Sequence, residues 1–489
     1  MNSDETKKDE LKLKLAFSGG GFRATFYCLG AFRRLVELGL WKNVYRIDSV
    51  SGGSITAGAI MLGLKECKKE HSDNFKDVKD FDQKVTKPLK RLGQSGFREK
   101  ITGRSLVILL TVWVLFLLGL CFLFFTFFYN SLSLNKFFAG LLSLLFALLI
   151  DTIFIVALFS IVWRSLYSIF FQRRLADGLF GNELMTSLPA YPEWSVNATC
   201  LNTCKRFRFK QTEFGGYKIG DTKDKYDIPI SFVVACSAAF PQVFAPLRLK
   251  LERNKRRFAS KYAYDTDSKY CALEEIYLTD GGVYDNLGIE NFLHAEGQFI
   301  AIDAGGYGSV EEKLSWPKMH LRIIDTALEQ TVLLRRRLLF KQNIIQSAEK
   351  NPEKAKGAIL ILGASVKEYV ANDKQIYGKF GVLSDECTEQ IPSYDFLFDN
   401  SEVDELIANL RTDLDTFHDV EIDLLMWAGE IRMDAIIKRY LNSYLTRDKF
   451  SETPQKPHYP KEAVKGILEK GQKTGFPFGV WFWKRKRNA

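Results

Sequence analysis

Short alternating and apolar runs open this chain of 489 residues. Leu11–Phe17 alternates and then becomes apolar, which is typical of a strand entering a core. A helical period follows over about Ala24–Leu38, then a short strand at Arg46–Val50 and a second helix at Ile55–Glu66. Two successive strand–turn–helix units predict an α/β sheet.

The rest of the chain shows the same mixture of strand and helix patterns. It contains no internal sequence repeat. A basic helical stretch covers Ala327–Gln346, and Val403–Leu445 has the period of helices. Five further runs have the length and apolar character of strands, namely Ser195–Leu201, Ile228–Val234, Glu275–Thr279, Gln298–Ile302 and Ala358–Leu362.

Two much longer apolar runs interrupt this pattern. Ser105–Tyr129 contains no charged residue, and Phe137–Trp163 is broken only by Asp151. Each run exceeds the roughly 20 residues that cross a bilayer. We therefore expect a two-helix transmembrane hairpin at 105–163; the alternative is a helical hairpin buried in the core. In a membrane, Asp151 would face a partner or the interface.

Basic residues flank the hairpin on both sides, whereas its turn holds only Lys136. The positive-inside rule then places both soluble parts in the cytoplasm, as parts of an integral membrane protein. The polar start of the chain does not resemble a secretory signal. The flanking residues are Lys87, Lys90, Arg91, Arg98, Lys100 and Arg104 before the hairpin, and Arg164, Arg173 and Arg174 after it.

These patterns predict five parts. They are the first part of an α/β domain (11–100), the hairpin (105–163), the second part of the domain (170–350), an α-rich C-terminal extension (351–465) and an aromatic-basic tail (466–489). The tail fits either a membrane interface or packing on the protein's own surface.

The formal net charge of +10 is spread along the chain, with clusters at Lys87–Arg104, Arg335–Arg337 and Lys484–Arg487. Two of these clusters flank apolar or aromatic stretches, which favours anionic lipid headgroups over nucleic acid. Any one cluster is equally well a solvated basic face. Arg335–Arg337 lies either along a membrane leaflet or on the exposed face of a packed helix.

Neither the cysteines nor the histidines indicate a metal site. The eight cysteines contain no C-x-x-C pair, and no H-E-x-x-H or Cys/His spacing occurs. Scattered thiols of this kind are typical of a reducing compartment. We expect no metal and no cofactor.

Candidate chemistry begins at the glycine-rich segment that follows the first strand. Gly19, Gly20 and Gly21 stand between that strand and the next helix, where backbone N–H groups can converge on an anion. The site suits a developing oxyanion or a phosphate. Gly19-x-Gly21-x-x-Ala24 also fits a dinucleotide fingerprint, but the nearest acidic strand end is Asp48 rather than one about 20 residues further on.

A second small-residue turn follows the second strand. Ser49-Val50-Ser51-Gly52-Gly53 is similar to the G-x-S-x-G nucleophile elbow, with Ser49 in place of the first glycine. It predicts Ser51 as a nucleophile, and Ser54 lies further on, inside the predicted helix. The alternative is an ordinary Ser/Gly turn at a helix start.

A third motif, Asp280-Gly281-Gly282, ends the apolar run Ile276–Thr279. An aspartate in this place can face the crevice at the end of a sheet, although Asp-Gly turns are common. Of the five histidines, His294 or His320 has the chain order needed for a Ser–Asp–His triad, but neither stands in a recognisable motif.

Together these motifs resemble those of the patatin-like phospholipase family. Two further stretches agree with it, Asn197-Ala-Thr199 and Ala235–Phe244, and the resemblance covers about Leu11–Leu64 and Leu175–Gly306. It implies a three-layer α/β/α sandwich with a mostly parallel sheet. It also implies a catalytic Ser51–Asp280 dyad without histidine, and an oxyanion hole at Gly19, Gly20, Gly21 and Arg23. Arg23 would support the loop or bind a headgroup phosphate. Ser49 and Gly53 would form the elbow, and Gly281 and Gly282 the aspartate motif.

The function implied is that of a membrane-anchored serine lipid acyl hydrolase of the phospholipase A type. Its partners would be membrane phospholipids and the lipid bilayer, with no nucleic acid, and the resemblance implies no oligomeric state. Ser51 would form an acyl-enzyme with a carboxylic ester. Ser49 in place of glycine and Ser18 in place of the usual aspartate depart from the family pattern. They leave open a patatin-like membrane scaffold with little or no activity.

Overall fold

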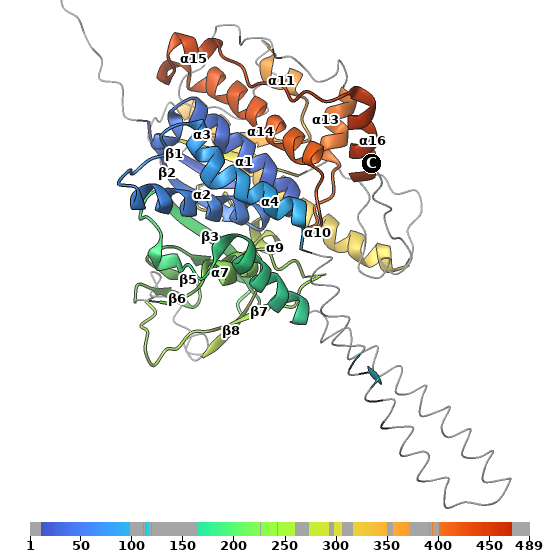
Figure 1. Ribbon diagram of the computed structural model, residues 1–489. Helices are drawn as coiled ribbons and strands as arrows, with labels where there is room; N and C mark the ends of the chain where they lie inside the picture. The colour runs from blue at the N-terminus through green and yellow to red at the C-terminus, as the bar shows by residue number, and fades with distance from the viewer. Residues whose placement is uncertain are drawn as a thin grey trace, which may run out of the picture.

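The computed structural model describes most of the chain outside the long apolar runs (Figure 1). The predicted hairpin lies outside the described residues except for five positions. His294, Lys484–Arg487 and most of the tail also lie outside them. The described residues are 11–97, 111, 113, 114, 116, 119, 165–224, 226–241, 243–259, 273–292, 298–305, 316–349, 356–371, 391, 394 and 401–471.

Five parallel strands form the centre of a ten-stranded sheet. Their order is β10-β9-β1-β2-β3, so the chain crosses over between neighbours and leaves the carboxyl ends of all five strands at one edge. Their bounds are β1 Leu13–Phe17, β2 Val44–Val50, β3 Glu193–Cys200, β9 Gln298–Asp303 and β10 Lys356–Ile361.

An antiparallel extension continues the sheet beyond β3. Strands β4, β5 and β6 follow in order, and β8 also pairs with β3 while β7 pairs with β8. These strands are β4 Lys205–Phe209, β5 Phe214–Gly216, β6 Gly220–Thr222, β7 Leu247–Lys250 and β8 Glu275–Asp280.

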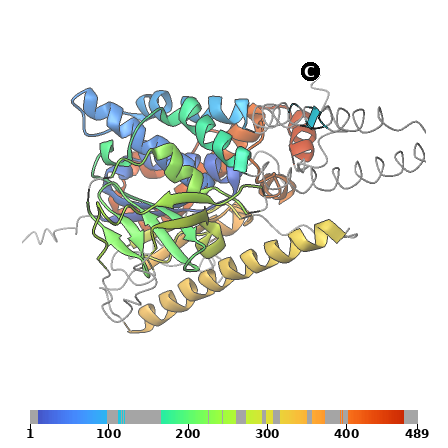
Figure 2. The ribbon, with the colours of Figure 1, turned by 90° about the horizontal axis from the view of Figure 1, so that it is seen from below.

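Helices cover both faces of the parallel strands and make three layers (Figure 2). Leu15 and Phe17 of β1 face the cluster that includes α1 (Gly21–Glu37), α2 (Gly52–Lys69) and α14 (Asp419–Tyr440). Ala16 faces the opposite cluster with Leu339 of α10 (Trp316–Glu349). This alternation follows from the two-residue period of a strand.

Shorter helices connect these elements. They are α3 Val78–Phe81, α4 Lys87–Ser95, α7 Ile230–Ser237, α9 Gly282–Asp285, α11 Val366–Val370, α13 Ser401–Ala408, α15 Arg447–Ser451 and α16 Lys461–Gly471. Further short helical turns are Leu40–Asn43, Asp82–Thr86, Ala176–Phe180, Met185–Ser187 and Asn442–Tyr444. In the described part of the chain, no helix is both long and apolar enough to cross a bilayer.

The predicted α/β fold with a parallel central sheet is confirmed, but two details differ. The run Ile228–Val234 was predicted to be a strand, and this prediction is wrong. Pro229 is instead the N-cap residue of the buried helix α7. A short, wholly apolar run has no period that separates a buried strand from a buried helix. The antiparallel strands β4–β7 were not expected, because Lys, Arg and Gly residues break their apolar pattern.

Candidate active site

The turn after β2 holds Ser51 in a strained conformation. Its φ of 50° and ψ of −121° lie in a region that residues with a Cβ rarely adopt. Strain of this kind costs on the order of 1–3 kcal/mol and persists only where the surroundings enforce it. Ser51 is 8% exposed and therefore largely buried. The expected strand–elbow–helix arrangement is present.

Glycines allow this turn to approach its neighbours closely. A Cβ on Gly53 would lie 2.6 Å from the carbonyl oxygen of Phe17, and one on Gly52 would lie 2.0 Å from that of Gly21. The Gly53 N–H also donates to the Ser18 carbonyl at 3.2 Å. The elbow and the glycine-rich loop are therefore packed backbone to backbone.

Asp280 lies at the end of β8, at the same level of the sheet as Ser51. Val50 pairs with Asn197, and Asp280 pairs with the next residue, Ala198. The sequence suggested an aspartate at the end of a strand, facing the crevice at the end of the sheet, and it left the direction of that strand open; β8 runs antiparallel to β3. Asp280 therefore comes to the carboxyl edge of the parallel sheet from the opposite direction.

The Asp280 carboxyl group lies beside Ser51. Its Oδ1 accepts from the Gly282 N–H at 2.7 Å. Burial raises the pKa of Asp280 to about 6, and the Gly282 N–H and the Ser51 side chain oppose the rise only in part. A carboxylate with this pKa is ionised at neutral pH and is a stronger base than an exposed aspartate.

The glycine-rich loop has the backbone geometry of an anion site. Gly20 has φ 134° and Gly21 has φ 53°, both favoured by glycine. The Gly19 N–H donates to the Asn286 carbonyl at 3.0 Å, and the Phe22 N–H donates to the Asp413 carbonyl at 3.2 Å. Among the described residues, no acceptor lies on the N–H groups of Gly20 and Gly21.

Arg23 points away from the anion site. Its Nη1 donates to the carbonyls of Ala408 and Leu410 at 2.8 and 2.9 Å, and burial lowers its pKa to about 10. Of the two roles expected for Arg23, these contacts fit support of the loop and not capture of a headgroup.

A segment of the C-terminal region closes over the same loop. A Cβ on Gly21 would lie 1.8 Å from the carbonyl oxygen of Thr412, so the two backbones touch. The Phe97 N–H donates to the Leu414 carbonyl at 2.9 Å. We call residues 408–416 the C-terminal strap. Sequence reasoning missed it, because backbone carbonyls leave no residue signature.

Buried hydroxyl groups of neighbouring serines hold the Ser51 elbow through hydrogen bonds. The Ser51 N–H donates to Ser237 Oγ at 3.0 Å, and Ser237 Oγ donates to the Asn197 carbonyl at 2.7 Å. Ser54 Oγ lies 3.0 Å from both Ser237 Oγ and Ser49 Oγ. Ser237 had no predicted role, although it lies in the stretch Ala235–Phe244.

Ser49, which replaces the usual glycine, is part of this buried network. Its Oγ accepts from Trp194 Nε1 at 2.9 Å and from Ser54 Oγ. The substitution therefore gives a buried indole N–H its acceptor. Ser54 is fully buried inside α2 and is not placed as a nucleophile.

Side chains of strand β3 join the Ser51 elbow to the end of β8 at Asp280. Asn197 Nδ2 donates to the Ser49 carbonyl at 3.2 Å, and Thr199 Oγ1 donates to the Asp280 carbonyl at 2.8 Å. The Asn197-Ala-Thr199 stretch thus fixes the distance between elbow and aspartate.

The described histidine side chains lie elsewhere. His71 and His458 are exposed, and His418 caps α14 by accepting from the Val420 N–H. No group of three or more His, Cys, Asp or Glu side chains in the described ranges is arranged to hold a metal ion. A charged cavity of about 910 Å³ lies between α1, α4 and α14, but its lining does not include Ser51 or Asp280.

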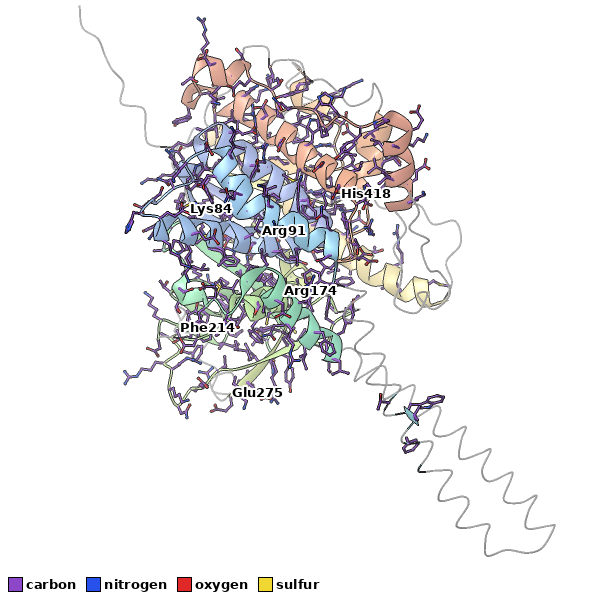
Figure 3. All side chains as sticks on the ribbon, viewed as in Figure 1. Lys84, Arg91, Arg174, Phe214, Glu275 and His418 are labelled. Atoms are coloured by element: carbon purple, nitrogen blue, oxygen red, sulfur yellow. The ribbon has the colours of Figure 1, made fainter. Side chains whose placement is uncertain are left out.

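The two stems of the inserted segment meet beside the glycine-rich loop. Phe97, just before the insertion, stacks on Phe22 with ring centroids 5.4 Å apart, and it also contacts Phe171 at 5.1 Å. Arg174 Nη2 donates to Ser95 Oγ at 2.6 Å and fastens the same two stems (Figure 3). The chain therefore leaves and returns next to the residues that would hold the oxyanion.

Comparison with known proteins agrees with these motifs. The patatin-like phospholipase family model matches residues 15–293, more than half of the chain. No curated protein matches.

Solved structures with some likeness include human GIVD cytosolic phospholipase A2, at 11% identity and a TM-score of 0.44, covering 90% of this chain and 63% of that chain. VipD from Legionella pneumophila gives 14% identity and a TM-score of 0.28, covering 73% of this chain and 62% of that one. The chain thus spans less than two thirds of either structure, and likenesses this weak carry no argument about function. The family match supports lipid acyl hydrolase activity in general, and on its extent the chain belongs to the patatin-like phospholipase family.

Proposed function

We propose that this protein is a serine lipid acyl hydrolase that cleaves carboxylic ester bonds of membrane phospholipids through a Ser51–Asp280 dyad. The observation that carries the proposal is the strained Ser51 turn beside the buried Asp280 carboxyl group, whose pKa is raised. Such a pairing of nucleophile and base has little use in a purely structural turn.

In the proposed reaction, Ser51 Oγ attacks the ester carbonyl and its proton passes to Asp280. Collapse of the tetrahedral intermediate breaks the C–O bond to the leaving alcohol, which takes that proton from Asp280. Water then attacks the acyl-enzyme, again with Asp280 as base, and releases a fatty acid. The Gly20 and Gly21 N–H groups would stabilise the oxyanion in both steps.

Membrane anchoring by the hairpin at 105–163 forms part of the proposal. Its support is the two long apolar runs of sequence, which hold Asp151 as their one charged residue, and the described positions Trp113, Val114 and Phe116, which are helical and 41–48% exposed. Large apolar side chains left exposed in this way suit a lipid environment. The stems beside Phe22 would then bring the active site to the cytoplasmic leaflet.

A fluorophosphonate probe tests the dyad on the purified full chain. Ser51→Ala should abolish labelling and lower ester hydrolysis by at least about 10³-fold, with an unchanged thermal unfolding temperature. Ser54→Ala is the matched control and should still label. Labelling that survives Ser51→Ala but is lost in Ser54→Ala would overturn the elbow assignment. A wild-type protein that neither labels nor hydrolyses esters would be the scaffold alternative.

A further inference from the structure

Helix α10 extends well past the edge of the sheet that holds the active site. Arg336 is paired with Asp303 at the carboxyl end of β9, and Leu339 packs lower down with Phe299. The helix therefore runs antiparallel to the strands. Val332 also packs against the cluster that contains Phe299, so the residues that extend past the carboxyl edge are Trp316–Thr331, over about 24 Å at 1.5 Å per residue. Figures 1 and 2 show the yellow N-terminal end running clear of the sheet.

Among the described side chains, the ion pairs between α10 and the catalytic layer lie near the sheet. Arg335 contacts Asp285 and Glu290, and Arg336 contacts Asp303. Two members of the Arg335–Arg337 cluster thus fasten the helix, and only Arg337 is exposed. These contacts show that the Arg335–Arg337 cluster belongs to a packed helix and does not lie along a membrane leaflet. They do not decide where the part of α10 before the cluster lies.

The outward face of α10 carries an apolar stripe. Met319, Ile323, Leu334 and Leu338 are 42%, 67%, 53% and 52% exposed. Their spacings of four, eleven and four residues return to one side of a helix with 3.6 residues per turn. A soluble surface scatters large apolar residues singly, so a stripe of this length indicates an interaction.

The charges along this stripe favour an anionic partner. Its other exposed members are Thr326, Ala327, Gln330 and Arg337, and none is acidic. Among the described side chains, the acidic Glu329 falls on another side of the helix at 100° per residue. The first nine residues, Trp316–Ile324, contain Lys318 and Arg322 and no acid.

We propose that the projecting half of α10 is an interfacial helix, which lies in the headgroup region of an anionic phospholipid leaflet and holds the active-site edge against it. The proposal rests on the proposed function, since the same leaflet would supply the substrate. An apolar stripe without acids on a helix too polar to span a bilayer is the pattern of a helix that lies on a membrane. The free end bears Met319 and Ile323, whereas Leu334 and Leu338 lie level with the sheet.

The two halves of the stripe provide a matched test on the full chain in nanodiscs of phosphatidylcholine with phosphatidylserine. A fluorescent amino acid incorporated at position 323 should be quenched by spin-labelled lipid, and one at position 338 should not. Met319→Glu with Ile323→Glu should lower hydrolysis of bilayer phospholipid by about tenfold or more, while hydrolysis of a water-soluble short-chain ester stays unchanged. Leu334→Glu with Leu338→Glu should change neither rate.

The outcomes separate this inference from the proposed function. Quenching at 323 in a protein that hydrolyses no ester would leave the helix on the membrane and reject the hydrolase. Hydrolysis of both substrates without quenching at 323, or equal quenching at 323 and 338, would overturn the interfacial helix. Protection of position 323 in detergent together with a doubled mass in light scattering would replace the leaflet by a second copy of the chain.

Discussion

The two loops beside the nucleophile are stabilised in opposite ways. The Ser51 elbow is held from within the family region, by the hydroxyl group of Ser237 and by strand β3. The Gly19–Arg23 loop is held in part from outside that region. Its Gly19 N–H donates to Asn286, but Phe22 and Arg23 donate to backbone carbonyls of the C-terminal strap at residues 408–416. A nucleophile needs a fixed turn, which nearby side chains supply. An anion site needs free N–H groups, so its support comes from elsewhere in the chain.

The largest expected effect follows from the tight contact of the elbow. Gly53→Ala places a methyl group 2.6 Å from the Phe17 carbonyl oxygen and 2.7 Å from that of Ser18. We expect a loss of about 3 kcal/mol or more in unfolding free energy, measured by chemical denaturation. Gly466→Ala in α16 is the control, since nothing lies within 4 Å of the added atom. Equal stability of both variants would refute the close packing.

Removal of the Arg23 side chain tests the support supplied by the C-terminal strap. Arg23→Met keeps bulk but loses two charge-assisted hydrogen bonds, so we expect a cost of about 2–3 kcal/mol and a lower kcat on every ester. Arg91→Met, an exposed change on α4, is the control. A higher KM for charged phospholipids alone, with normal stability, would instead assign Arg23 to headgroup binding.

Ser237→Ala sharpens the role of side chains at the elbow. Without its hydroxyl, the Ser51 N–H loses its acceptor, at a cost of about 1–2 kcal/mol. We expect kcat to fall by about tenfold while KM stays constant, because the nucleophile is mispositioned and the substrate site is intact. Ser231→Ala, at a buried position of the same helix, should leave kcat unchanged. A rise in KM alone would argue against a positioning role.

The raised pKa of Asp280 also predicts how the reaction depends on pH. Asp280 must be ionised to accept a proton, so kcat/KM should fall about tenfold per unit below pH 6. The raised pKa means that the folded protein binds this proton more tightly than the unfolded chain does. The Asp280 contribution to stability therefore increases as pH falls from above 6 towards 4. A profile flat down to pH 4.5 would exclude Asp280 as the base.

The sequence by itself determined the local chemistry of the site. Glycines at 19–21, 52 and 53 and a serine at a strand-to-helix turn permit only a few backbone forms, so Ser51 and its turn were predictable. The parallel strands were also predictable, because their apolar runs are long enough to be recognised as strands. It did not determine that Ile230–Ser237 is a helix, because an apolar run alone lacks a period.

Only the tertiary structure decided which groups meet. The antiparallel course of β8 brings Asp280 to Ser51, and the C-terminal strap takes Arg23 and leaves two N–H groups open. The tertiary structure also places the first turns of α10 beyond the edge of the sheet that holds the active site. These relations depend on contacts between residues far apart in the sequence, many through backbone atoms that every residue carries. No local pattern records them, so the side-chain motifs specified the parts of the site and the packing specified their arrangement.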